Sequence, residues 1–394
     1  MIKTVVFLVQ RIGPYHHARL CAWSAARPGT VKVIEFRPTD TVYAWTAVKE
    51  DGGYERFQTH FRKELCRVLD QLQPQILVCV SYADPEINQA TAWALRHRVP
   101  LVTCCDSTFD DMPRSWAKES FKRHIVAAFD AALVAGSRAD DYLKRLGLGG
   151  DRQFRPWDVI DNAYFAHGAE QSRAHDPALR ERLNLPSRYF LCVARFVPKK
   201  NLLRLIEAFA RYAAQAGQDT WSLVLSGTGP LESGLRAAVA AAGLDTMVLF
   251  PGFLQYPDLP AFYGLAGAFV LPSVSDQWGL VVNEAMAAGL PVLVSTRCGC
   301  APDLVREGEN GFTFDPENIE AFARRLTQVA GLNQARRAAM GQRSREIVAA
   351  FSPAAFATGL EAAIACATTR QRTRKSWFTR MLVNLLARRS PSND

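Results

Sequence analysis

Short apolar segments alternate with longer segments of helical periodicity along most of the chain. In the amino-terminal half, runs of β-branched and apolar residues predict five buried strands, over 5–9, 31–36, 75–80, 99–105 and 131–136. Between them, the spacing of apolar residues predicts helices over 17–26, 55–73, 86–98, 115–129 and 138–146. This alternation is typical of an α/β fold with a doubly wound parallel sheet.

The carboxyl-terminal half continues the same alternation and indicates a second domain. Its apolar runs are YFLCV, WSLVLS, TMVLF, GAFVLP, PVLVS and GFTF. A length of 394 residues suits two ordinary domains. An apolar content of 48% with 22% charged residues is typical of a soluble globular protein with a substantial core.

The cysteines and the amino terminus favour a reduced, cytoplasmic location. The nine cysteines form no CxxC pair, and several lie within apolar runs, where a thiol is usually a small core residue. The first apolar run, MIKTVVFLVQ, has no small-residue cleavage pattern and is too short to span a bilayer. We therefore expect it to be the first strand.

The net charge of +9 is concentrated at the carboxyl terminus. Residues 370–394 contain seven Arg or Lys residues and one Asp, so the rest of the chain is close to neutral. A basic nucleic-acid groove is therefore not expected, and nucleic acid is excluded as a partner.

The most informative stretch is SVSDQWGLVVNEAMAAG, residues 273–289. It predicts a tight loop after a buried strand, with Ser275 or Asp276 capping a helix that begins at Gly279 and Leu280. The helix start offers free N–H groups for a phosphate. Asp276 and Glu284 place two carboxylates nearby, which suit sugar hydroxyls. The alternative is an ordinary strand–helix unit with solvated acids.

This stretch resembles the acidic-x7-acidic signature of retaining glycosyltransferases of the group 1 type (family 4). The resemblance implies that Asp276 contacts hydroxyls of the donor sugar and that Glu284, within EAMAAGLPVLVS, holds the nucleotide ribose. Asp stands where the family usually has Glu, which shortens the reach by one methylene. The implied fold is GT-B: two Rossmann-like domains face a cleft, and a carboxyl-terminal helix crosses back to the first domain.

Two cations follow the strand YFLCV and resemble the family segment G-R-L-x-x-x-K-G. Arg195 and Lys200 occupy the matching positions, while Asn201 stands where glycine is common. Such a pair suits a diphosphate and the negative charge that develops on the departing nucleotide, so no metal is expected. Lys199 is a competitor for this role, and a solvated basic turn is the alternative.

Glycines and a turn near the base complete the expected donor site. Gly227 and Gly229 in SGTGP resemble the family's nucleotide-contacting loop, and Gly279 with Leu280 opens the helix of the acidic motif. Phe253, in the PGF turn, or its neighbour Leu254 is expected beside the base.

The amino-terminal domain supplies candidates for the acceptor side. Gly13, His16 and His17 lie in the loop after the first strand. The resemblance places Gly13 with the donor-binding residues, near the donor phosphates. His16 and His17 are candidates for acceptor or phosphate contacts, and they are equally well explained as polar residues at a helix start. Asp106 falls where many family members have a histidine that touches the donor sugar. A DxD metal motif is not present as such, which argues against a metal-dependent GT-A enzyme.

We expect five segments along the chain. They are an amino-terminal domain (1–165), a linker with a short helix (166–186), a nucleotide-sugar domain (187–350), a crossover helix (351–369) and a basic tail (370–394). In the tail, an amphipathic helix places apolar side chains on one face, namely Trp377, Phe378, Met381, Leu382, Leu385 and Leu386. Residues 370–389 either bind an anionic membrane surface or dock on their own domain.

The function implied by the resemblance is a retaining, metal-independent hexosyltransferase without a cofactor. A nucleotide diphosphate sugar is the donor, and a hydroxyl of a glycan, a lipid-linked molecule or a small molecule is the acceptor. Cell-surface polysaccharide or glycoconjugate synthesis is the expected setting, in the cytoplasm or at the inner membrane face. The alternatives are a catalytically silent nucleotide-sugar-binding subunit and an epimerase of the same fold.

Overall fold

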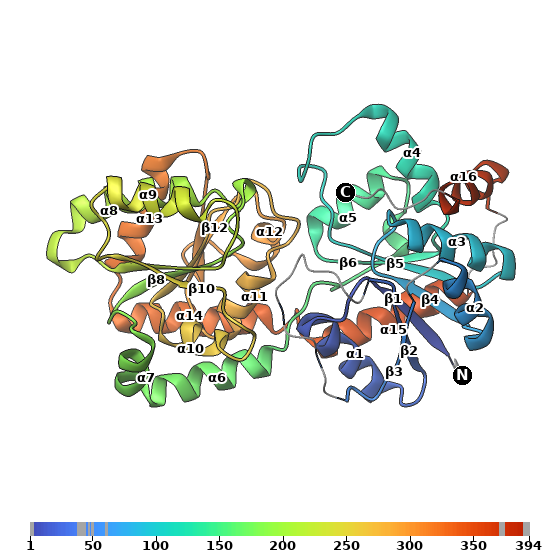
Figure 1. Cartoon of the computed structure of the whole chain (residues 1–394), viewed down its shortest axis with the longest axis horizontal. Coiled ribbons are helices and arrows are strands. Elements are labelled where there is room, and N and C mark those ends of the chain that lie inside the picture. Colours follow the sequence, from blue (N-terminus) through green and yellow to red (C-terminus); the bar gives the residue numbers. More distant parts are fainter. Residues whose placement is uncertain are drawn as a thin grey trace. The chain divides into compact units, whose positions relative to one another are not determined.

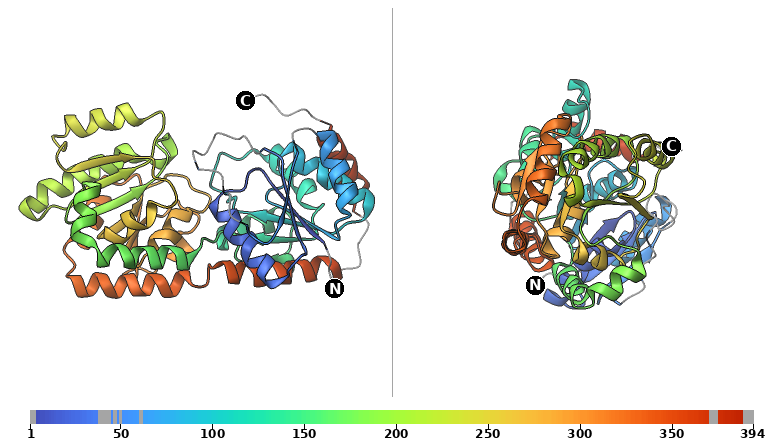
Figure 2. Two further views of the ribbon diagram at one scale, coloured as in Figure 1. Left: turned by 60° about the horizontal axis from the view of Figure 1, so that its bottom comes forward. Right: turned by 90° about the vertical axis from the view of Figure 1, so that its left-hand side faces the viewer.

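The computed structural model describes residues 4–37, 45, 48, 51–59, 62–369 and 375–388. The chain divides into two compact units (Figures 1 and 2). Unit 1 comprises Met1–Val159 and Pro353–Asp394, and unit 2 comprises Ile160–Ser352. Each unit is built on its own parallel sheet, as the alternation of strands and helices predicted.

The sheet of unit 1 has the strand order β3-β2-β1-β4-β5-β6-β7, and all of its strand pairs are parallel. The strands are β1 (Val5–Val9), β2 (Val31–Glu35), β3 (Glu55–Gln58), β4 (Ile76–Cys79), β5 (Leu101–Cys105), β6 (Ala131–Val134) and β7 (Gln153–Phe154). The helices of this unit are α1 (Pro14–Ala26), α2 (Arg62–Leu72), α3 (Pro85–His97), α4 (Trp116–Val126), α5 (Ser137–Arg145), η1 (Gly150–Arg152), α15 (Pro353–Thr369) and α16 (Trp377–Ala387).

The five strands predicted in this half are confirmed, but the helix predicted over 55–73 is wrong in its first part. Residues 55–58 form β3, which pairs with β2 at the edge of the sheet. Three of its four side chains are exposed, so the segment lacks the apolar run that identifies a buried strand. Lys32 on β2 pairs with Glu55 across the two strands at 2.9 Å.

The sheet of unit 2 has the order β10-β9-β8-β11-β12-β13, again with parallel pairs. Its strands are β8 (Tyr189–Val193), β9 (Ser222–Ser226), β10 (Val248–Gly252), β11 (Ala268–Leu271), β12 (Val292–Ser295) and β13 (Gly311–Phe314). Its helices are α6 (Asn162–Ala174), α7 (Asp176–Leu183), η2 (Pro198–Lys200), α8 (Leu202–Ala216), η3 (Gly217–Asp219), α9 (Glu232–Ala241), α10 (Leu259–Leu265), α11 (Leu280–Ala287), α12 (Ala301–Leu304), α13 (Ile319–Ala330) and α14 (Gln334–Val348). Between β8 and β11 the chain order reverses, which makes this the switch point of the sheet.

Most of residues 166–186, where the sequence favoured a linker with a short helix, lies in the two helices α6 and α7. Asp161 caps α6 by accepting a hydrogen bond from the Tyr164 amide at 3.0 Å. Phe165 and Ala169 are fully buried on the inner face of α6. At Gly264 on α10 an added Cβ would meet the Ala169 backbone at 2.8 Å, so the two helices are in close contact. The polar residues of this segment are therefore the outer face of helices that belong to unit 2.

The last helices pack on unit 1. α15 buries Phe356, Leu360 and Ile364, and its Gly359 lies so close to Arg155 that an added Cβ would be 2.2 Å from the backbone oxygen. By length and composition, one helical stretch of the described residues, 334–369, is apolar enough to cross a membrane. Its α15 part buries one face, with Phe356, Leu360 and Ile364, within unit 1.

The tail helix α16 docks on its own domain, which is one of the two alternatives predicted for it. It lies against α3 and α4 (Figure 1), with Leu382, Val383 and Leu386 buried. Lys375, just before the helix, pairs with Asp130 at 3.0 Å. The expectation that Trp377, Phe378 and Leu385 share the face of Leu382 and Leu386 is wrong, because these three side chains are exposed. Residues 370–374 and 389 of the predicted basic segment lie outside the described residues.

Candidate functional site

The predicted donor residues of unit 2 gather on loops at the carboxyl ends of neighbouring strands. Arg195 and Lys200 follow β8, Gly227 and Gly229 follow β9, and Asp276 follows β11. β8 lies between β9 and β11 in the sheet, so these three loops meet at the switch point. In open α/β sheets, this edge is where ligands bind.

An ion pair joins the loops after β8 and β11. The Lys200 Nζ lies 2.5 Å from Asp276 Oδ2, and the two side chains are 13% and 12% exposed. Ser273 donates a second hydrogen bond to the same oxygen at 3.2 Å. Desolvation lowers the pKa of Lys200, but the Asp276 carboxylate outweighs it, so that pKa is raised and the lysine is held as a cation. The sequence predicted both residues for the site but assigned them to different parts of the ligand.

Asn201, which replaces the glycine common in the family, fits its position for two reasons. Its φ of 58° and ψ of 32° lie in the left-handed region, which Gly and Asn tolerate best. Its side-chain amide donates to the backbone oxygens of Pro272 at 3.1 Å and Pro316 at 2.9 Å. The buried side chain therefore fastens the Lys200 loop to the segments that follow β11 and β13.

The loop that carries Asp276 is fixed by the chain after β12. Gly299 donates its N–H to the backbone oxygen of Asp276 at 2.9 Å. An added Cβ on Gly299 would lie 1.7 Å from the backbone oxygen of Gln277. The expected helix cap is wrong: Gly279, with φ of 102°, is the N-cap of α11, and no side chain caps the helix. The helix therefore begins at Leu280, one residue later than predicted.

Gly227 and Gly229 bring the loop after β9 against the loop after β8. Their φ angles are 141° and 153°, and an added Cβ on Gly227 would lie 1.8 Å from the Ala194 oxygen. The Phe196 amide donates to the Thr228 oxygen at 2.8 Å. Glycine is therefore needed here, because the backbones of the loops after β8 and β9 are in direct contact beside the switch point.

Glu284 is fully buried on α11 and is held by a tyrosine that the sequence did not single out. The Tyr263 hydroxyl, on α10, donates to Glu284 Oε2 at 2.6 Å. Tyr263 packs edge-on against Phe165 of α6 at 5.8 Å between ring centroids. The only signal of this in the sequence was an aromatic residue in a helix before the strand GAFVLP, which also fits a core position.

A group of aromatic rings lies around this carboxylate. Tyr256 stacks on Tyr164 at 4.8 Å, and burial, followed by the nearby Glu284 charge, raises the pKa of Tyr256 well above its usual range. The Tyr164 hydroxyl donates to the Tyr256 backbone oxygen at 3.4 Å. Glu284 is therefore surrounded by aromatic rings, and one tyrosine hydroxyl donates a hydrogen bond to it.

Other predicted donor residues are more open. Arg195 is half-buried in the loop after β8, whereas Lys199 is exposed. Phe253 follows β10 and is half-buried, as is Leu254. Within the described residues, no group of three or more His, Cys, Asp or Glu side chains is placed to hold a metal ion.

In unit 1, the loop after β1 leads into α1, whose N-cap is Gly13. His16 lies beside a buried ion pair between Arg19 and Asp158, which are 3.0 Å apart. Desolvation, with a contribution from Arg19, lowers the pKa of His16 to about 3, so its ring is neutral at physiological pH. His17 points its Nδ1 at the Tyr54 hydroxyl at 2.9 Å, inside the same unit.

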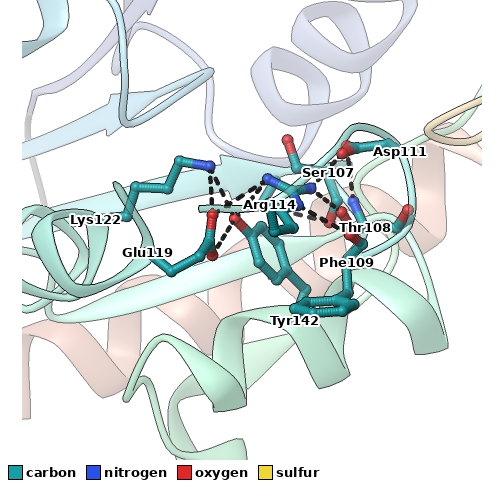
Figure 3. A network of polar contacts seen from close by, with 9 residues as sticks. Ser107, Thr108, Phe109, Asp111, Arg114, Glu119, Lys122 and Tyr142 are labelled. Atoms are coloured by element: carbon teal, nitrogen blue, oxygen red, sulfur yellow. Dashed lines mark hydrogen bonds and ion pairs between the residues drawn. The ribbon is translucent and has the colours of Figure 1, made fainter. Parts of the chain in front are cut away.

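The loop that follows β5 and Asp106 contains a polar network centred on Arg114 (Figure 3). Arg114 contacts the Asp111 carboxylate and the Thr108 oxygen and donates to the Tyr142 hydroxyl at 2.8 Å. Tyr142 in turn donates to Glu119 at 2.8 Å. Asp111 is thus paired with Arg114, while Asp106 precedes the network and is half-buried. Burial lowers the pKa of Arg19, and the charges of Asp158 and Asp106 oppose this lowering.

Comparison with known proteins supports the assignment of unit 2. Residues 177–347 match the family described as glycosyl transferases group 1. A similar curated protein is the GDP-mannose-dependent alpha-(1-6)-phosphatidylinositol monomannoside mannosyltransferase of Mycobacterium tuberculosis. It is 30% identical over 200 residues, which are 48% of this chain and 51% of that protein. The chain therefore matches about half the length of this curated relative.

Solved structures resemble the chain over nearly its whole length. HepE of Anabaena, in complex with UDP, has a TM-score of 0.72 at 15% identity and covers 92% of this chain and 99% of its own. The alpha,alpha-trehalose-phosphate synthase (UDP-forming) of Burkholderia vietnamiensis has a TM-score of 0.75 at 16% identity, over 95% and 99%. At such identities the likeness concerns the fold, and it confirms the predicted GT-B class. Residues 177–347 thus match the group 1 glycosyltransferase family, and the chain has the two-domain GT-B fold.

Proposed function

We propose that the protein is a retaining glycosyltransferase that transfers a sugar from a nucleotide diphosphate sugar to a hydroxyl acceptor. The observation that carries this proposal is the meeting of Lys200, Asp276 and the glycine loop at the switch point of unit 2. A lysine held as a cation at that edge suits a diphosphate, and a carboxylate beside it suits the hydroxyls of the adjoining sugar.

Each residue has a defined part in the proposed reaction. Arg195 and Lys200 bind the diphosphate and stabilise the negative charge on the leaving nucleotide. Lys200 exchanges part of its contact with Asp276 for the phosphate, and Asp276 then accepts hydrogen bonds from the sugar. Glu284, oriented by Tyr263, accepts hydrogen bonds from the ribose hydroxyls. Transfer occurs on the front face of the sugar, where a leaving phosphate oxygen takes the proton of the incoming hydroxyl.

The comparisons agree with this choice of donor. HepE was solved with UDP and with UDP-glucose, and the mycobacterial relative is named for GDP-mannose. We propose a hexose donor of this nucleotide class. A glycan, a lipid-linked molecule or a small molecule supplies the acceptor hydroxyl, in cytoplasmic synthesis of a cell-surface polysaccharide or glycoconjugate.

A panel of nucleotide sugars tests the proposal. Purified protein is incubated with UDP- and GDP-hexoses, and release of the nucleoside diphosphate is followed with and without simple sugar acceptors. We expect turnover with one donor, a loss of at least tenfold in Lys200→Ala, and little change in Lys199→Ala, the exposed neighbour that serves as control. An α-configured product from an α-configured donor, read by NMR, supports retention.

Two outcomes contradict the proposal. Binding of a donor without any turnover would instead favour the silent binding subunit, and conversion of the donor into its epimer would favour the epimerase. Wild-type turnover by Lys200→Ala would remove Lys200 from the mechanism.

A further inference from the structure

Unit 1 carries an unusual concentration of exposed apolar side chains. Of the eight large apolar side chains that are exposed among the described residues, seven lie in unit 1, on α4, α16 and the loop before α4. Trp116, the first residue of α4, is 87% exposed, and Trp377, the first residue of α16, is 75% exposed. Single exposed apolar side chains are normal, but a group of them rimmed by polar residues indicates an interaction site.

The two helices that carry these side chains lie next to each other. α16 packs on α4 (Figure 1). Phe378 of α16 meets His124 of α4 edge-on at 4.6 Å between ring centroids. Trp116, Ser120 and His124 are spaced by four residues, so they follow one side of α4 toward this contact. We call the exposed side chains Trp116, Phe121, Trp377, Phe378 and Leu385 the α4–α16 surface.

The charge around this surface is positive. Lys118 and Arg123 on α4, Arg380 on α16 and Arg388 directly after α16 are exposed. The acids beside them are already paired: Glu119 lies 2.9 Å from Lys122, and Asp130 lies 3.0 Å from Lys375. The surface therefore combines protruding tryptophans with a surplus of exposed cations.

We propose that the α4–α16 surface docks on an anionic membrane. Tryptophan favours the boundary between headgroups and acyl chains, because its ring is apolar and its N–H can still meet water. Cations beside it are attracted to anionic lipids, each contributing about 1 kcal/mol near the surface. The buried face of α16, Leu382, Val383 and Leu386, holds the helix on unit 1, so the membrane meets a preformed surface and not a free helix. This inference does not depend on which donor the protein uses.

Co-sedimentation of the full-length protein with vesicles tests this proposal. The vesicles are phosphatidylglycerol mixed with phosphatidylcholine, with pure phosphatidylcholine for comparison. We expect the wild type to prefer the anionic vesicles and Trp116→Ala/Trp377→Ala to lose roughly tenfold in partitioning. Lys118→Ala and Arg380→Ala each lose about fivefold at low salt, and high salt weakens the wild type. The matched control is Leu203→Ala, which truncates an exposed apolar side chain of unit 2.

The same series separates the membrane from other occupants. The proposal is overturned if Trp116→Ala/Trp377→Ala partitions like the wild type. It is also overturned if the wild type binds both vesicle types equally. Wild-type self-association that these substitutions abolish, without any vesicle binding, would make the surface an interface between two copies. The truncated side chains are exposed, so thermal melting should be unchanged, and the cation variants provide a second test if it is not.

Discussion

The ion pair between Lys200 and Asp276 leads to a prediction for stability and for ligand binding. Lys200→Met leaves a largely buried carboxylate without its cation, and Asp276→Asn leaves a largely buried cation without its carboxylate. Breaking a buried pair on one side costs about 3–5 kcal/mol. Because each side chain is a little over a tenth exposed, water offsets part of this cost. We therefore expect each single substitution to lower the free energy of unfolding by roughly 2–3 kcal/mol.

The double variant Lys200→Met/Asp276→Asn should cost clearly less than the sum of the two single variants. It removes both charges together, so neither remains buried alone. We expect a coupling free energy of about 1–3 kcal/mol from urea denaturation of all four proteins. The pKa of Lys200 is raised in the folded state, so the stabilisation is present below the unfolded pKa of about 10.4 and is lost only as pH rises through the folded pKa. Measurement at pH 7–8 therefore captures the whole effect.

Binding of UDP or GDP without a sugar isolates the phosphate contact. Lys200→Met should weaken it by on the order of tenfold or more, because a charged hydrogen bond is lost. Asp276→Asn should strengthen it, because the carboxylate no longer competes for Lys200, although turnover of a sugar donor should fall. Isothermal titration calorimetry measures both affinities. Additive stability losses, within about 0.5 kcal/mol, together with unchanged affinities would refute this account of the pair.

Three further predictions follow from other contacts. Tyr263→Phe should raise the KM for the donor several-fold with a smaller effect on kcat, because Glu284 loses the hydroxyl that orients it; equal KM values in steady-state kinetics would contradict this. The pKa of His16 is lowered in the folded state, so the unfolded state takes up the proton first as pH falls. The free energy of unfolding should therefore fall as pH drops from about 6.5 toward 3, by up to about 1.4 kcal/mol per pH unit. Urea denaturation at pH 7 and pH 5 should show a smaller loss of this free energy in His16→Gln than in the wild type. Gly227→Ala should lower the melting temperature strongly, because its Cβ meets a backbone oxygen, whereas Gly13→Ala, with open space at its Cβ, should melt like the wild type.

Much of the proposed donor site could be located in the fold because its residues lie in short segments with a strong pattern. The buried strands β8, β9 and β11 are apolar runs, and parallel strands bring the loops at their carboxyl ends together. Arg195, Lys200 and the acidic motif follow two of these runs directly. The apolar runs therefore placed these residues directly after strands, and the family resemblance assigned them to one site, whereas the order of the strands in the sheet was not predicted.

Contacts between residues far apart in the sequence could not be predicted in the same way. Lys200 and Asp276 are separated by 76 positions, and nothing in either segment indicates that they bond to each other. Tyr263 looked like any aromatic residue of a core helix until its hydroxyl was seen beside Glu284. The edge strand β3 was missed because its polar side chains hide the pattern that identifies buried strands.

The departures of this chain from the family pattern have different physical consequences. Asn201 in place of glycine keeps the left-handed backbone and adds two hydrogen bonds that tie the loop after β8 to its neighbours. Asp276 in place of glutamate has a shorter side chain, and it meets the lysine of that same loop. The asparagine holds in position the loop from which Lys200 reaches the aspartate. The two exchanges therefore act on one structure, a cross-link between the segments after β8 and β11, and the position of Lys200 depends on both.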